Sequence, residues 1–314
     1  MKKLCYPAIL ILFFCPPGNA QQTATIDQIG NNNQVMIEQI GFENAVNVIQ
    51  KVSNSVSLIE QNGSRNEAFQ LNSSFDVYNA YKQQITQKGY RNEASQNHLA
   101  GNNLGMQKIT QTGNWNLASQ VTTADASSAI ISQAGNYNNA EEKILWPSNR
   151  GEATISQDGN HNNSLILIAG NQSRSQEDKA TIISNGSYNG SNTQPVSILL
   201  VGDNHSATIE QGREGMISNN TAAINLVNPL NSNSDTGSNA KISQENGGNN
   251  TAYITSIGLN NGKSDINQDG DADRLQINQY GANHYGELNV FGSGLGGIIT
   301  QTGNGSIVKV TRTN

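Results

Sequence analysis

An aliphatic residue followed two positions later by glutamine recurs along the whole chain. Most copies lie one or two units of about eleven residues apart, as in proteins built from stacked units of fixed shape. The aliphatic and anchor pairs, in which only Ser184 replaces glutamine, are Ile26 and Gln28, Ile37 and Gln39, Val48 and Gln50, Ile59 and Gln61, Ile85 and Gln87, Ile109 and Gln111, Ile131 and Gln133, Ile155 and Gln157, Ile182 and Ser184, Ile209 and Gln211, Ile242 and Gln244, Ile266 and Gln268, Ile277 and Gln279, and Ile299 and Gln301. This register predicts one backbone shape repeated throughout the chain.

Turn residues follow the anchors at fixed distances. A glycine usually stands two residues past the anchor and an asparagine five residues past it. The best-preserved turn positions are Gly30, Asn33, Gly41, Asn44, Gly63, Asn66, Gly89, Asn92, Gly113, Asn116, Gly135, Asn138, Gly159 and Asn162. Because both residue types tolerate a positive φ, we expect them to form the turns between short strands.

Side chains alternate within each copy, which is the pattern of a strand with one buried face. Ile26 and Gln28 share one face, and Asp27 lies on the other. Strand, turn, strand and turn make one rung, and the sequence predicts an all-β solenoid of about twelve rungs with cross-β stacking. In the anchor column, each buried amide can donate to the carbonyl of the next rung.

The composition excludes a thick core. Of the 314 residues, 35% are hydrophobic and 5% are aromatic. A narrow slot filled by the aliphatic column and by small residues such as Ala129 and Ala153 remains possible. A polar, repetitive composition also suits a disordered chain, but the fixed Ile-to-Gln spacing favours the solenoid.

Residues 1–20 have the features of a secretory signal peptide, namely two lysines, an apolar run over residues 4–14 and the small residues Gly18 and Ala20. Both cysteines lie in this segment, so the mature chain, residues 21–314, is expected to have no disulfide and no thiol ligand. A lipoprotein signal with an acylated Cys15 fits less well, because the bulky Phe14 precedes it. No other run approaches the ~20 apolar residues that span a bilayer.

The charge of the mature chain disfavours nucleic acids and anionic membranes as partners. Removal of the two signal lysines leaves 16 basic and 24 acidic residues, a net charge of −8. Irregular segments interrupt the register near residues 72–82, 144–152, 172–179 and 225–238. They contain Pro147 and Pro229, which cannot donate to a strand ladder, so we expect loops there.

The motif Gln-x-Gly, followed by Asn, Ala and a second Gln, resembles the curlin repeat of curli subunits. It is clearest in Gln111, Gly113, Asn116 and Ala118, and in the copies that begin at Gln87 and Gln133. Several copies depart from the pattern, with Arg213 in place of the turn glycine, Ser184 in place of the anchor and Glu142 at an inward position.

The resemblance implies a secreted subunit of an extracellular functional amyloid, which forms biofilm fibres with itself and with other curli-type subunits. It also implies a secretion channel and accessory chaperones as partners. Within the family, a nucleator is an alternative, because Lys309 and Arg312 make the last rung basic. From another class, the alternative is a monomeric solenoid adhesin or carbohydrate-binding module.

No pattern of an enzyme, a metal site or a cofactor site stands out. The histidines, which are His98, His161, His205 and His284, are isolated, and we expect them to be solvated turn or loop residues. Residues 265–273 have oxygen-ligand spacing like the start of an EF-hand loop. However, Gln276 stands where the bidentate glutamate should be, and Ile266 and Gln268 already serve the solenoid register.

Two surface patterns remain. Trp115, Tyr137, His161 and Tyr188 occupy the same turn position in successive copies. We expect these rings to stack between rungs, and the alternative is an exposed strip that binds carbohydrate or dye. The threonines before Ile155, Ile182 and Ile209 are too few for the flat columns of an ice-binding solenoid.

We expect both ends of the solenoid to lack a helical cap. An uncapped terminal rung offers unpaired N–H and C=O groups to an arriving strand. Because the first and last rungs share one register, contact between copies would not close and would produce a filament. The sequence therefore predicts polymerisation as the activity.

Overall fold

The computed structural model describes residues 8–14, 21–73, 81–99, 104–146, 148, 150–170, 177–202, 205–212, 219–227, 239–245, 248–257, 263–271, 273–282, 285–291, 294, 296–304 and 307–313. Every regular element in these ranges is a β-strand. Among the same residues, no helix is long and apolar enough to cross a membrane.

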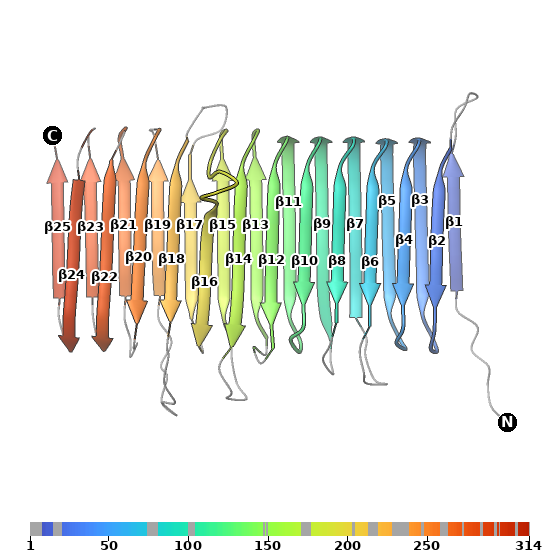
Figure 1. Cartoon of the computed structure of the whole chain (residues 1–314), viewed down its shortest axis with the longest axis horizontal. Coiled ribbons are helices and arrows are strands. Elements are labelled where there is room, and N and C mark those ends of the chain that lie inside the picture. The colour runs from blue at the N-terminus through green and yellow to red at the C-terminus, as the bar shows by residue number, and fades with distance from the viewer. Residues whose placement is uncertain are drawn as a thin grey trace.

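The strands form two parallel sheets that follow chain order (Figure 1). The 13-stranded sheet contains β1 (Ala8–Phe14), β3 (Gln34–Phe42), β5 (Val56–Ser64), β7 (Tyr81–Tyr90), β9 (Gly105–Asn114), β11 (Ser128–Asn136), β13 (Glu152–Asp158), β15 (Lys179–Asn185), β17 (Ser206–Gln211), β19 (Asn239–Glu245), β21 (Lys263–Asp269), β23 (Tyr285–Phe291) and β25 (Ile307–Thr313). The 12-stranded sheet contains β2 (Thr23–Gln28), β4 (Ala45–Gln50), β6 (Glu67–Asn72), β8 (Glu93–His98), β10 (Leu117–Thr122), β12 (Asn139–Leu145), β14 (Asn163–Gly170), β16 (Val196–Gly202), β18 (Thr221–Val227), β20 (Thr251–Ile257), β22 (Arg274–Ala282) and β24 (Gly296–Asn304). One strand from each sheet makes a rung, so the expected all-β solenoid is confirmed.

The repeat copies divide between the two sheets. Ten of the aliphatic residues, from Ile37 and Ile59 through to Ile266, align in the 13-stranded sheet. Ile26 and Val48 align in the 12-stranded sheet instead, as do Ile277 and Ile299. Leu288 and Val310 continue the first column beyond Ile266 without a glutamine anchor.

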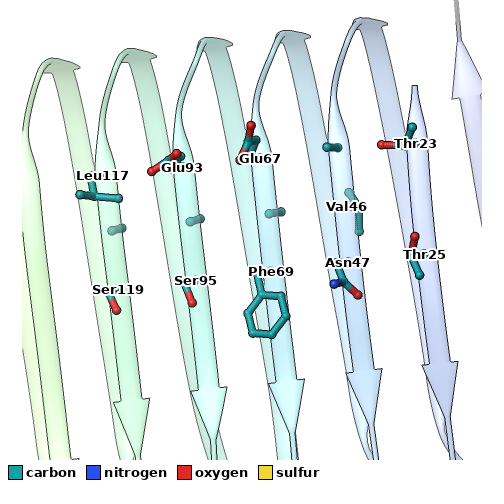
Figure 2. Close-up of a pocket in the computed structure, with 14 residues that line it drawn as sticks. Thr23, Thr25, Val46, Asn47, Glu67, Phe69, Glu93, Ser95, Leu117 and Ser119 are labelled. Atoms are coloured by element: carbon teal, nitrogen blue, oxygen red, sulfur yellow. The ribbon is translucent and has the colours of Figure 1, made fainter. Parts of the chain in front are cut away.

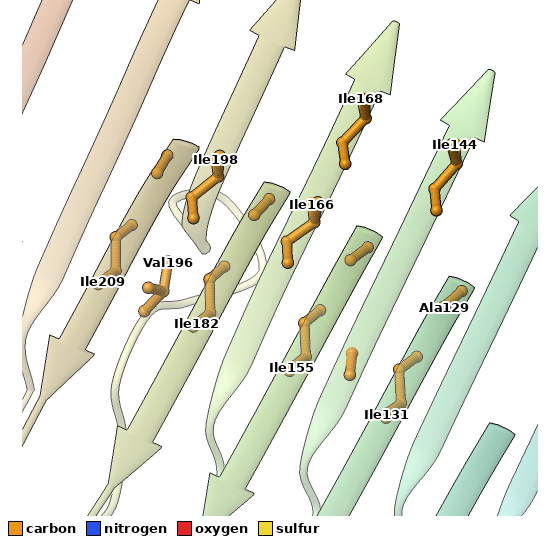
Figure 3. Packing of buried hydrophobic residues seen from close by; sticks show 14 of the residues in the cluster. Ala129, Ile131, Ile144, Ile155, Ile166, Ile168, Ile182, Val196, Ile198 and Ile209 are labelled. Atoms are coloured by element: carbon orange, nitrogen blue, oxygen red, sulfur yellow. The ribbon is translucent and has the colours of Figure 1, made fainter. Parts of the chain in front are cut away.

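The core is a thin double layer. Isoleucines of the 13-stranded sheet, such as Ile131 and Ile155, face Ile144, Ile166 and Ile168 of the other sheet across a narrow slot (Figure 3). These five side chains have no exposed surface. Alanines two residues before the isoleucines of the first column, such as Ala129 and Ala153, are buried as well, and in two earlier rungs the same column holds the buried glutamines Gln83 and Gln107.

The turn glycines and asparagines have different roles, which corrects the expectation that both supply a positive φ. The seven turn glycines from Gly30 to Gly159 have φ between 104° and 128°. The asparagines themselves do not have a positive φ, and the residue before each one does, as Trp115 (59°) and Tyr137 (57°) illustrate. The asparagine instead contributes its side-chain amide, as described below.

The irregular segments lie mostly outside the described residues. Strand β6 ends at Asn72 and β7 begins at Tyr81, with residues 74–80 not described. Residues 147, 149, 171–176 and 228–238 are likewise not described, and neither is Arg213. The segment predicted as a signal peptide contains one described strand, β1, which pairs in parallel with β3.

We predict that Gly113→Ala strongly destabilises the solenoid. Gly113 has φ 114°, and a Cβ there would lie 1.9 Å from the Gly135 carbonyl oxygen. Backbone strain of about 1–3 kcal/mol is expected before the clash is counted. The urea midpoint of the monomer measures the effect. Gly296→Ala, where the nearest atom is 3.4 Å away and φ is ordinary, should change stability by less than about 0.5 kcal/mol. Equal effects of the two substitutions would contradict this account.

Candidate functional site

The anchors of the 13-stranded sheet form a continuous ladder of side-chain amides. Each Nε2 donates to the Oε1 of the next rung at 2.7–2.9 Å, through Gln39, Gln61, Gln87, Gln111, Gln133 and Gln157. All six side chains are buried. Every bond points toward the higher-numbered rung, so the ladder has a direction.

The same amides also hold the backbone of the opposite sheet. Nε2 of Gln111 lies 2.8 Å from the Glu93 carbonyl oxygen and 3.0 Å from that of Asn116. Gln87 and Gln133 likewise donate to carbonyl oxygens of the facing strands, those of Glu67 and Leu117. A buried amide that satisfies both a neighbouring rung and the facing strand stabilises the solenoid, whereas an unpaired amide would destabilise it.

Ser184 interrupts the ladder. Because its side chain is too short to reach the previous rung, Gln157 donates to Ser164 Oγ at 3.0 Å. The ladder resumes from Gln211 through Gln244 to Gln268, with bonds of 2.5 and 2.6 Å.

A second amide ladder lies in the 12-stranded sheet, and the repeat analysis did not identify it. Gln70, Gln96 and Gln120 donate in turn at 2.9 Å, and Gln120 ends on Glu142 Oε2. These residues occupy the column of Ile26 and Val48. The second glutamine of the curlin pattern was the signal that could have found them.

The turn asparagines form a third ladder, along the edge where the two sheets meet. In successive rungs Oδ1 accepts the backbone N–H of the next asparagine at about 3.0–3.1 Å, from Asn44 to Asn189. Nδ2 donates to the glycine carbonyl of the next rung, as in Asn92 to Gly113 at 2.8 Å. Further along, Asn250 takes this position, not Asn249 as the five-residue spacing suggests.

Glu142 is an acid in an amide column. Its side chain is fully buried, and desolvation raises its pKa well above the usual range, opposed by a hydrogen bond from Gln120. In the next strand of the 12-stranded sheet, β14, the residue aligned with Glu142 is Ile166, whose side chain cannot form a hydrogen bond with the carboxyl. A hydrogen bond from the Ile155 backbone also opposes the rise in the pKa of this carboxyl. A protonated carboxyl, which resembles the glutamine amide in shape, suits this position.

Two of the histidines are buried, which corrects the expectation that all are solvated. His98 lies on β8, stacks on Tyr81 with ring centroids 3.8 Å apart, and bonds Thr122 Oγ1 at 3.0 Å. Burial lowers the pKa of His98 and of His205 to about 4. Their folded pKa values are below the unfolded value of 6.5, so their contribution to stability is lost as pH falls through this range. His284 lies outside the described residues.

The aromatic turn residues stack on one another. Centroid distances are 6.1 Å for Trp115 and Tyr137, 4.9 Å for Tyr137 and His161, and 4.8 Å for His161 and Tyr188, all near parallel. The Arg91 guanidinium covers the Trp115 ring at 4.4 Å. The rings are partly exposed, but the faces of Trp115, Tyr137 and His161 that a sugar ring would stack on are occupied by neighbouring side chains.

A groove lies on the outer face of the 12-stranded sheet (Figure 2). It has a volume of about 600 Å³ and is lined by outward residues of five adjacent strands, including Phe69, Ser95 and Ser119. Glu67 and Glu93 face outward in register on neighbouring strands.

The acidic segment at residues 265–273 includes an extended strand. Asp265 and Asn267 point outward from β21, while Ile266 and Gln268, which alternate with them, are buried. An EF-hand loop instead wraps its ligands around one point. Within the described ranges, no group of three or more histidine, aspartate or glutamate side chains is placed to hold a metal ion.

The sheets end in edge strands at both ends of the described solenoid. The 13-stranded sheet ends at β1 and β25, and the 12-stranded sheet ends at β2 and β24. An edge strand offers backbone groups that another strand can pair with. Lys309 on β25 forms an ion pair with Glu287 at 3.2 Å, and the Arg312 side chain is outside the described part.

Comparison with protein families gives a match to part of the chain. A family model described as the curlin associated repeat matches residues 23–51, which cover β2, β3 and β4. This match agrees with the repeat seen in the sequence. None of the curated proteins compared with the chain matches it.

We predict that Gln111→Leu destabilises the solenoid by about 2–4 kcal/mol, because it removes an amide ladder step and leaves buried partners unsatisfied. Gln84→Leu is the matched control, since Gln84 lies on the outward face of β7, beside the buried Ile85 and Gln83. Its effect should stay within about 0.5 kcal/mol. Urea midpoints measure both, and a Gln111→Leu midpoint equal to that of the control would refute the structural role of the ladder.

We predict that Glu142→Gln stabilises the protein at pH 8 by about 1–3 kcal/mol, because a neutral amide replaces a buried acid. The raised folded pKa means that the wild-type contribution is present below the unfolded value of 4.5 and is lost as pH rises toward the folded value. The gain should therefore shrink at pH 4. Urea unfolding at both pH values tests this, with exposed Glu60→Gln as control. A gain independent of pH would count against the prediction.

Proposed function

We propose that this chain, which carries the curlin repeat, is a secreted structural subunit that self-assembles into extracellular, curli-type amyloid fibres of a biofilm matrix. In this role its main partner is another copy of itself, together with other curli-type subunits. A secretion channel and accessory chaperones would deliver it to the cell surface. The fibres would serve adhesion and cell aggregation.

The in-register parallel stack with edge strands at both ends carries this proposal. Successive rungs already pair within one molecule as cross-β strands do, with buried ladders of identical amides. Addition of one more rung needs no new type of contact. A second molecule can therefore extend the stack with the same interactions that hold one molecule together.

A carbohydrate-binding module is less well supported than a fibre subunit. Sugar recognition by aromatic residues requires a free ring face, and the faces of Trp115, Tyr137 and His161 are covered by one another and by Arg91. The stacked rings instead offset the strain of positive φ at these turn positions. Their geometry supports a structural role along the edge of the solenoid.

We predict that purified residues 21–314 form thioflavin-positive filaments after a lag, and that sonicated filaments remove the lag from fresh monomer. Oriented filaments should show a meridional reflection near 4.7–4.8 Å. Ile131→Asp, which places a charge in the slot, should abolish assembly, whereas Ile130→Asp on the outward face of the same strand should permit it. A chain that keeps a constant monomeric mass for days with seeds present would disprove the proposal.

A further inference from the structure

Strand β1 occupies the edge of the solenoid that a second molecule would need. It pairs with β3 over its whole length, with Ile11 opposite Ile37 and Phe13 opposite Gln39. Leu10 and Leu12 are exposed on the outer face. The predicted cleavage near Gln21 would remove this strand and uncover the backbone groups of β3.

The C-terminal strand of another copy fits the same edge in the same register. In the 13-stranded sheet, Val310 of β25 continues the column that Ile37 begins, because Ile266 aligns with Leu288 and Leu288 aligns with Val310. Both β25 and β1 are seven residues long. A copy of β25 placed on β3 would therefore set Val310 opposite Ile37 and Lys309 opposite Met36.

The direction of the amide ladders makes one arrangement of copies favourable. Since each Nε2 donates toward the higher-numbered rung, the lower-numbered end of each ladder presents acceptors. Gln28 Oε1 and Gln39 Oε1 are buried, and among the described residues neither has a hydrogen-bond donor. Hydrogen-bond donors placed next to β2 and β3 would therefore satisfy these two oxygens.

The residue of β1 in register with Gln39 is Phe13, and phenylalanine is a residue type that has no side-chain hydrogen-bond donor. In β25 the same register position is Arg312, a residue with several donors. In the other sheet, Gln301 of β24 occupies the column of Gln28, since both lie two residues after the aligned isoleucines.

We infer that β1 is an intramolecular plug that takes the place of the C-terminal strand of a second copy, and that a fibre grows only when β1 leaves and β24 and β25 of that copy pair with β2 and β3. This inference rests on the proposed self-assembly and adds its polarity and its control. The unprocessed chain would thereby be kept from polymerising before the predicted signal segment is removed.

The test uses the full chain with Cys5→Ser, Cys15→Ser, Met36→Cys and Lys309→Cys. Strands β3 and β25, which carry positions 36 and 309, lie at opposite ends of one solenoid (Figure 1), so a disulfide between these positions can form only between copies. Adjacent strands bring Cα atoms within the 4.4–6.8 Å that a disulfide needs. A Thr311→Cys partner in place of Lys309→Cys is out of register by two residues and is the geometric control.

Release of the plug is tested with two double substitutions in β1. Ile11→Pro with Leu12→Pro removes strand hydrogen bonds, whereas Leu10→Ala with Leu12→Ala keeps them. We expect the proline variant to assemble with a lag about tenfold shorter than that of the intact chain, because the intact chain exposes its edge only a fraction of the time. Disulfides between positions 36 and 309 should accumulate in the proline variant, and the alanine variant should behave like the intact chain.

Two results would overturn the plug. One is an intact chain that assembles and cross-links as fast as the proline variant. The other is filaments of the proline variant whose cysteines link no better at positions 36 and 309 than at 36 and 311. A failure of all variants and of residues 21–314 to form filaments on seeding would instead refute the proposed function, and the inference with it.

Discussion

A buried side-chain amide is stable in this protein because an identical amide lies one strand spacing away. Gln87, Gln111 and Gln133 each donate to the next rung and accept from the previous one. The slot between the sheets is too thin to exclude water by apolar bulk alone, so the ladders provide both filling and hydrogen bonding. The remaining features of the fold keep the rungs in the register that these bonds require.

The turns maintain that register because their glycines and asparagines have different roles. Glycine permits the rungs to approach so closely that a Cβ at Gly113 would meet the carbonyl of Gly135. Asparagine then binds that carbonyl and the backbone of the next rung through its amide. The residue before the asparagine adopts a positive φ, and where it is aromatic, ring stacking offsets the strain.

The same ladders connect the internal structure with assembly. Because the amide-to-amide bonds of the glutamine ladders all point toward the higher-numbered rung, the two ends of the described solenoid differ chemically, and a second copy fits one orientation best. The amide ladders are interrupted at two described positions. Ser184 breaks one ladder, Glu142 closes another with an acid whose pKa is raised by burial, and the rungs that follow Glu142 in the 12-stranded sheet rely on aliphatic residues such as Ile166 and Ile198.

The spacing of Ile26, Gln28 and their counterparts by itself determined the strands, the rungs and the solenoid, because a period of two within a copy and a fixed interval between copies allow few other packings. It could not assign each copy to a sheet, since one unit of about eleven residues can stack on its neighbour or face it across the slot. Only the tertiary structure decided that Ile277 and Ile299 lie opposite the column of Ile37, that Gln96 and Gln120 form a second ladder, and that His98 is buried. These outcomes depend on which strands face each other, and that is a property of long-range pairing that no local pattern contains.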